Sequence, residues 1–166
     1  GQYKPSKRKT NLKNINYLAL HGTYDNQVQS FMSLNQLERI RFNDSSYHFK
    51  SALYIHGVDH NQFNTTWGRK DSFVPFPGLK NTEPLMSRDN QQNLAKVYIG
   101  AFLDVTLKNK TSYLPLFIDY RTGSDWLPAT VYMNNFEDSN TSYLCDFNED
   151  FDLSTTTIEK GKISTN

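Results

Sequence analysis

The sequence predicts an α/β fold built around two neighbouring parallel strands. Two short apolar runs, residues 15–20 and 51–56, are each followed by a glycine, and a segment with helical spacing separates them. Short apolar runs that stop at glycine are typical of buried parallel strands, and strand, helix and strand in this order form a βαβ unit. The chain has 166 residues, which is the size of one ordinary domain.

Two helices are predicted from the spacing of apolar residues. Residues 27–41 place apolar side chains near one helical face, with Asp25 and Asn26 before them as capping residues. Residues 88–107 give the strongest helical pattern, and Ser87 or Asp89 can cap its start. Its apolar residues recur at intervals of three and four: Leu94, Val97, Tyr98, Ala101, Phe102 and Val105. Residues 64–90 form a long loop rich in proline, and loops of this length are usually functional.

The composition of the chain changes along its length and suggests three segments. Residues 1–14 are basic and are interpreted as a leader or linker, and residues 15–122 contain the predicted α/β unit. Within that unit, residues 111–120 are apolar and are expected to pack against it or to line a pocket. Residues 123–166 alternate short β-like runs with turn residues. We therefore expect the last segment to be the start of a β-rich module.

Charge, hydropathy and cysteine content exclude several classes of protein. The formal net charge of +1 creates no field that would attract nucleic acid. No apolar run approaches the roughly 20 residues that a membrane-spanning helix needs. The single cysteine, Cys145, rules out an internal disulfide, and the four histidines match no metal-ligand spacing. We therefore expect no nucleic-acid partner, no membrane span, no metal and no other cofactor.

The exit of the first predicted strand carries a candidate catalytic acid. Asp25 follows the strand by five residues, after the sequence His21-Gly22-Thr23. A carboxylate at such a position can orient a catalytic imidazole, fix its tautomer and stabilise the imidazolium that forms during acyl transfer. The glycine lets the chain reverse so that the carboxylate points into a site. An aspartate between a strand and a helix is also an ordinary helix cap, and this alternative stays open.

The exit of the second predicted strand carries a candidate general base. His60 follows Gly57 in the sequence Gly-Val-Asp-His. A histidine in a loop is often only a polar surface residue. Two successive strand exits that carry Asp25 and then His60 favour a catalytic pair, because parallel neighbouring strands bring their carboxyl ends together.

These two strand exits resemble the acid turn and the histidine loop of α/β-hydrolases, in particular of secreted chlorophyllase-like and polyester-hydrolase-like lipases and esterases. The motifs are H-G-T-x-D at residues 21–25 and H-N-Q-F-N-T-x-W-G-R-x-D at residues 60–71. The resemblance extends over about residues 17–107. It implies a secreted or cell-envelope hydrolase of carboxylic esters, with Asp25 as the triad acid and His60 as the general base. Phe63 and Trp67 are candidates to wall an acyl pocket, and packing beneath the long loop is an equal alternative.

The nucleophile motif of this family, G-x-S-x-G, does not occur in the sequence. In the family it precedes the acid strand. The resemblance therefore implies the C-terminal part of an α/β-hydrolase sheet, whose serine lies outside this chain and which alone turns over no ester. The expected partners are an ester substrate and the N-terminal half of the hydrolase domain, and the edge of the half-sheet allows self-association. The alternative is a non-catalytic binding or scaffold module derived from the same fold.

Overall fold

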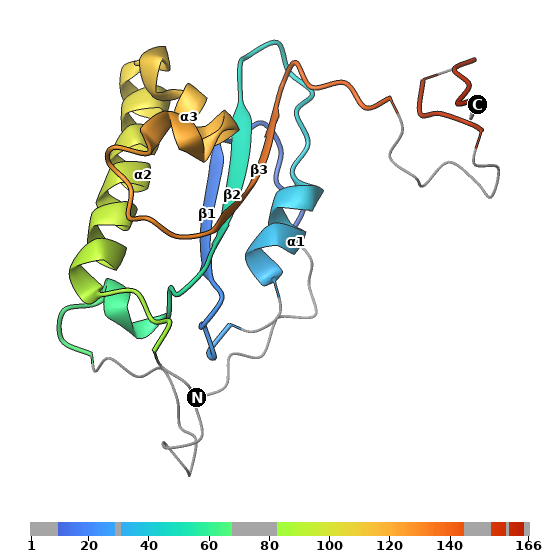
Figure 1. Cartoon of the computed structure of the whole chain (residues 1–166). Coiled ribbons are helices and arrows are strands. Elements are labelled where there is room, and N and C mark those ends of the chain that lie inside the picture. Colours follow the sequence, from blue (N-terminus) through green and yellow to red (C-terminus); the bar gives the residue numbers. More distant parts are fainter. Residues whose placement is uncertain (1–9, 29–30, 68–82, 145–153, 159, 165–166) are drawn as a thin grey trace.

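A three-stranded sheet with helices on both faces forms the body of the chain (Figure 1). The computed structural model describes residues 10–28, 31–67, 83–144, 154–158 and 160–164. Strands β1 (Tyr17–Gly22) and β2 (Phe49–Ile55) are parallel, and β3 (Tyr132–Asp138) is antiparallel to β2. The α/β class and the parallel pair of strands are thus confirmed. In the sheet order β1-β2-β3, β1 has no strand on its outer side among the described residues.

The helix α2 (Arg88–Lys108) covers one face of the sheet, and α1 (Met32–Arg39) lies against the other (Figure 1). Of the two capping candidates, Ser87 is the N-cap of α2 and accepts the N–H of Asn90, whereas Asp89 lies in the first turn. The helix ends at Asn109 in the left-handed conformation that asparagine tolerates. α1 is shorter than the predicted segment, and no side chain caps it. No helix in the described ranges is long and apolar enough to cross a membrane.

The main hydrophobic core lies between α2 and the sheet. Residues 111–120 complete it through the short helix α3 (Pro115–Ile118), which stands between the 3-10 turns η3 (Thr111–Tyr113) and η4 (Tyr120–Gly123). The expectation that this segment packs against the α/β unit is confirmed. The buried members of this core include Phe49, Leu53, Ile55, Leu94, Tyr98, Ala101, Val105, Leu116 and Phe117. The residues of α2 in this set follow the predicted spacing of three and four, which keeps them on one face.

The strand β3 lies in residues 123–166, where the sequence suggested a separate β-rich module. It pairs with β2 from Phe49–Asp138 to Ile55–Tyr132 and therefore belongs to the same sheet as the βαβ unit. In the described residues beyond β3, the remaining pairing is one isolated bridge between Thr155 and Lys162. The sequence pattern of β3 indicates a strand but does not specify its partner, because strand pairing joins residues far apart in the chain.

A buried ion pair joins β2 to β3. The Nζ atom of the fully buried Lys50 lies 2.9 Å from Oε1 of Glu137 and donates to the carbonyl of Ile40 at 3.0 Å. A buried ammonium that loses its counter-charge is strongly destabilising. We therefore expect Glu137→Gln to lower the free energy of unfolding by about 3 kcal/mol in urea denaturation.

The matched control for this prediction is Asp104→Asn, which removes the shared partner of Lys108 and Lys110, two lysines whose side chains are 63% and 51% exposed. Exposed pairs contribute little, so this variant should unfold at the same urea concentration as the wild type. If Glu137→Gln also unfolds like the wild type, Lys50 is hydrated in solution and the pair is not buried.

Candidate active site

The carboxyl ends of β1 and β2 lie side by side, because the two strands are parallel and Gly22 pairs with Ile55. Backbone hydrogen bonds then tie the two outgoing loops together. The N–H of Thr23 donates to the carbonyl of Ile55 at 3.0 Å, and the N–H of Tyr24 donates to that of Val58 at 2.9 Å. The residues that follow each strand are thereby held next to each other.

The two loops bring Asp25 and His60 together, as the sequence predicts. Nδ1 of His60 lies 3.4 Å from Oδ2 of Asp25. The other carboxylate oxygen, Oδ1, accepts the backbone N–H groups of Gln27 at 2.9 Å and Val28 at 2.8 Å. Asp25 therefore closes a turn of its own loop, whereas the N-cap position of α1 is Phe31.

The pair combines a fixed acid with an accessible imidazole. The Asp25 side chain is 11% exposed, whereas that of His60 is 37% exposed. The separation of 3.4 Å is longer than a typical N–H···O hydrogen bond, and catalytic hydrogen bonds are often long without substrate. A carboxylate that accepts Nδ1–H leaves Nε2 of the imidazole as the proton acceptor. This is the state in which a histidine can act as a general base.

A buried glutamine of α2 forms hydrogen bonds with the loop after β2 that carries His60. Gln91 is fully buried, and its Nε2 donates to the backbone carbonyl of Asp59 at 2.6 Å. Its Oε1 accepts the N–H of Asp59 at 3.2 Å. The Asp59 carboxylate in turn accepts the N–H of Gln62 at 2.9 Å. These bonds fix the backbone on both sides of His60.

Asp59 and Gln91 have structural roles that the sequence interpretation missed. Asp59 directly precedes His60 in a loop, yet its own exposure is only 1%. One signal was available in the sequence, because Gln91 stands three residues before Leu94 on the apolar face of α2. A polar residue in such a stripe indicates a buried hydrogen-bonding partner.

Trp67 flanks the imidazole of His60, with ring centroids 6.1 Å apart and ring planes at 16°. The guanidinium of Arg88 holds this part of the loop by donating to the carbonyls of Thr65 at 3.2 Å and Trp67 at 2.7 Å. Trp67 remains 49% exposed beside His60. Residues 68–71 of the motif lie outside the described residues.

Phe63 lies on the 3-10 turn η1 (Asn61–Phe63) and is 37% exposed. Within the described ranges, no ring contact joins it to His60 or Trp67. The structure therefore brings together three of the four predicted site residues, namely Asp25, His60 and Trp67. The fourth, Phe63, makes no ring contact with His60 or Trp67 in the described part of the chain.

A second histidine lies at the end of β1 and was not singled out from the sequence. His21 stacks on Tyr54 with a centroid distance of 5.3 Å and on Phe31 with a distance of 5.5 Å. Burial lowers the pKa of His21 below its ordinary value, and the negative charge of Asp25 opposes this shift without cancelling it. The lowered pKa favours the neutral form of the His21 ring next to the Asp25–His60 pair.

The fold and the site define an α/β protein in which two adjacent strand ends carry a hydrogen-bonded aspartate–histidine pair. In the part of the chain that the structure describes, no three His, Cys, Asp or Glu side chains group as a metal site. The chain matches no family model, and no similar protein was found among curated proteins or solved structures. Its function is therefore inferred from side-chain geometry and chemistry.

Proposed function

We propose that this chain supplies the acid and the base of a serine hydrolase that cleaves carboxylic esters. The observation that carries the proposal is the contact between Asp25 and His60, which are 35 positions apart in the chain and 3.4 Å apart in space. Both residues follow neighbouring parallel strands. A Ser–His–Asp relay requires such a carboxylate, held in place, on the nitrogen of the imidazole that does not contact the nucleophile.

Each residue has a defined role in the proposed reaction. The serine oxygen attacks the ester carbonyl carbon while Nε2 of His60 takes the serine proton. His60 then gives this proton to the leaving alcohol as the acyl–oxygen bond breaks. Water repeats the sequence on the acyl-enzyme and releases the acid. Asp25 keeps the imidazole in the required tautomer and stabilises the imidazolium.

The nucleophile in this proposal comes from outside the chain, because G-x-S-x-G is absent from the sequence. Among the described residues, β1 pairs with a strand on one side only. The rest of a hydrolase sheet can therefore pair with the open edge of β1. A parallel strand added there ends at the same sheet edge as Asp25 and His60. Trp67, exposed beside His60, is the proposed contact for the apolar part of the ester, and Phe63 on the preceding turn η1 is a second candidate.

The tautomer of His60 tests the acid–base pair in this chain itself. In the wild type we expect the neutral ring to carry its proton on Nδ1, because Asp25 accepts it. In Asp25→Asn, the amide can donate to Nδ1, so the proton should move to Nε2. Long-range ¹H–¹⁵N NMR spectra report the two forms. The pair of His48 and Asp44, which lies elsewhere on the surface, is the internal reference and should not change.

An unchanged His60 tautomer in Asp25→Asn, or an Nε2-protonated ring in the wild type, would contradict the proposed role of Asp25. The nucleophile needs a separate test, in the longest protein encoded by the same reading frame. A fluorophosphonate reagent should label one serine of that protein within G-x-S-x-G. Absence of both the label and the motif would support a non-catalytic binding or scaffold module.

A further inference from the structure

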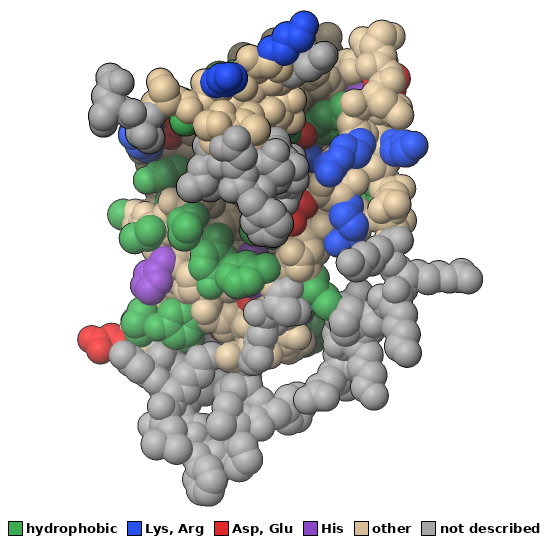
Figure 2. Space-filling view, turned by 90° about the vertical axis from the view of Figure 1, so that its right-hand side faces the viewer, with side chains coloured by type: hydrophobic (Ala, Val, Ile, Leu, Met, Phe, Trp, Pro, Cys, Tyr) green, Lys and Arg blue, Asp and Glu red, His purple; other side chains and the backbone are tan. Residues whose placement is uncertain are grey.

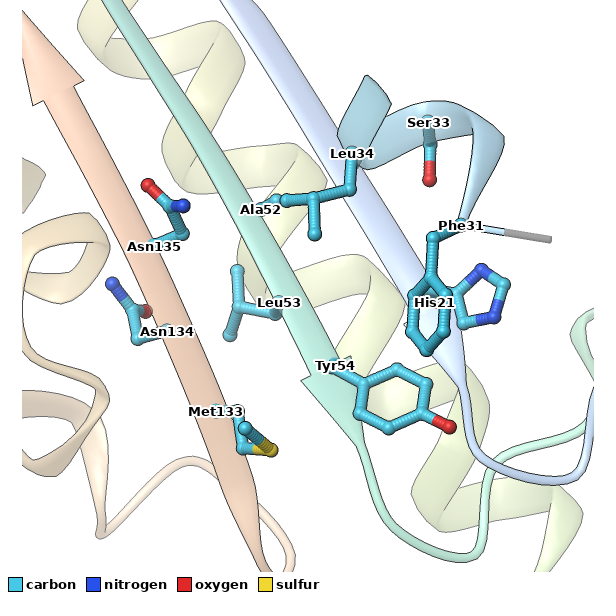
Figure 3. Close-up of a pocket in the computed structure, with 11 residues that line it drawn as sticks. His21, Phe31, Ser33, Leu34, Ala52, Leu53, Tyr54, Met133, Asn134 and Asn135 are labelled. Atoms are coloured by element: carbon cyan, nitrogen blue, oxygen red, sulfur yellow. The ribbon is translucent and has the colours of Figure 1, made fainter. Parts of the chain in front are cut away.

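A pocket of about 340 Å³ lies on the face of the sheet beside α1 (Figure 3). Its floor follows from the strand register. Ala19 of β1 pairs with Ala52 of β2, and Ala52 pairs with Asn135 of β3. Alternate residues of a strand share a face, so these three side chains form one row. The two alanines leave the middle of the sheet face hollow.

Larger side chains surround this floor. One row nearer the strand ends, His21 pairs with Tyr54, and Tyr54 pairs with Met133. Phe31 joins the ring cluster, and Leu34 of α1 stands on the opposite side from Met133 (Figure 3). Figure 2 shows this face of the molecule, with hydrophobic side chains gathered on it and a histidine beside them. A smaller hollow of about 200 Å³ shares Tyr54 and Met133.

The lining restricts the charge of a ligand. None of the described residues that line the pocket is Lys, Arg, Asp or Glu. The imidazole of His21 lies at one end of the pocket, and burial lowers its pKa, which favours its neutral form. A charged ligand would lose its hydration without gaining an opposite charge. The pocket therefore suits an uncharged ligand.

The size and shape of the pocket restrict the ligand further. A dry apolar cavity of about 150 Å³ takes a benzene ring, and this pocket has about twice that volume. The flat alanine floor fits a planar molecule. Aromatic rings at one end and the thioether of Met133 favour an aromatic ligand. Ser33 and Asn135 offer hydrogen-bonding groups in the lining.

We propose that this pocket binds an uncharged ligand of two fused aromatic rings with one hydrogen-bonding substituent. The ligand lies on Ala19 and Ala52 between Leu34 and Met133, with its edge against Tyr54. This site is separate from the proposed esterase chemistry and does not require His60.

The probe for this proposal is 2-naphthol, titrated into the whole chain and followed by methyl and amide NMR. We expect saturable shifts of Ala19, Ala52 and Met133 with a Kd on the order of 1 mM or below, as such a small ligand allows. Ala52→Leu fills the floor and should weaken binding at least about tenfold. Met133→Lys, at a position 64% exposed, should weaken binding without disturbing the core.

The control variant is Leu107→Lys, an equally polar change at an exposed position of α2, which should leave the Kd unchanged. His60→Ala should also leave it unchanged, so this result does not depend on the esterase proposal. Absence of shifts at the pocket residues, or full binding by both Ala52→Leu and Met133→Lys, would overturn the site. Tighter binding of 1-octanol than of 2-naphthol would overturn the aromatic class. Loss of binding in His60→Ala would place the ligand at the catalytic pair instead.

Discussion

His60→Ala is expected to lower kcat/KM for a carboxylic ester by about four to six orders of magnitude in the protein that carries both this chain and its nucleophile. The variant removes the only group proposed to accept the serine proton, so the serine stays protonated and attacks poorly. The residual rate reflects binding and the oxyanion site. Hydrolysis of 4-nitrophenyl butyrate by the wild type and the variant gives the comparison.

The matched control is His48→Ala. His48 also contacts an aspartate, with Nε2 3.1 Å from Oδ1 of Asp44, but this pair lies at the start of β2 and away from the strand ends that carry Asp25. Its removal should leave kcat/KM within about twofold of the wild type, because it changes no group in the proposed relay. Activity of His60→Ala close to that of His48→Ala would remove His60 from the mechanism.

Gly22→Ala is expected to lower the free energy of unfolding by more than about 3 kcal/mol. A Cβ atom at this position would stand 2.1 Å from the carbonyl oxygen of Val58 and 2.6 Å from its carbon. Both atoms belong to the backbone of the histidine loop, so no rotation of a side chain relieves the overlap. The two loops must separate, which also draws Asp25 away from His60. Urea denaturation measures the first effect, and the His60 tautomer measures the second.

Gly100→Ala provides a control with the opposite expected sign. Gly100 lies within α2, and a Cβ there meets nothing within 4 Å. Glycine inside a helix is less favourable than alanine by about 0.5–1 kcal/mol, so this variant should be more stable by that amount. If Gly22→Ala is as stable as the wild type, the loops after β1 and β2 are not in the close contact described above.

Much of the site could be predicted because its determinants are local. The ends of β1 and β2 are marked by glycines, and the chain order places Asp25 after one strand and His60 after the other. Parallel neighbours put both exits at one sheet edge, so the closeness of these two residues could be predicted from the strand pattern. The helix α2 was equally predictable, since Ser87 and the apolar spacing act within a few residues of each other.

Other features depend on residues that meet only after folding. The partner of β3, the burial of Lys50 and the support of the histidine loop by Gln91 each join positions far apart in the chain. A lysine or a glutamine has the same local pattern in solvent as in a core, so its neighbours decide its role.

The parallel pair, the long helix and the closeness of Asp25 to His60 could therefore be predicted from the sequence. The pairing of β3 with β2 and the hollow over Ala19 and Ala52 could be seen only in the folded chain. The physical reason is that periodicity and capping are properties of neighbouring residues. The pairing of strands, the burial of polar groups and the shape of a pocket are properties of the packed chain.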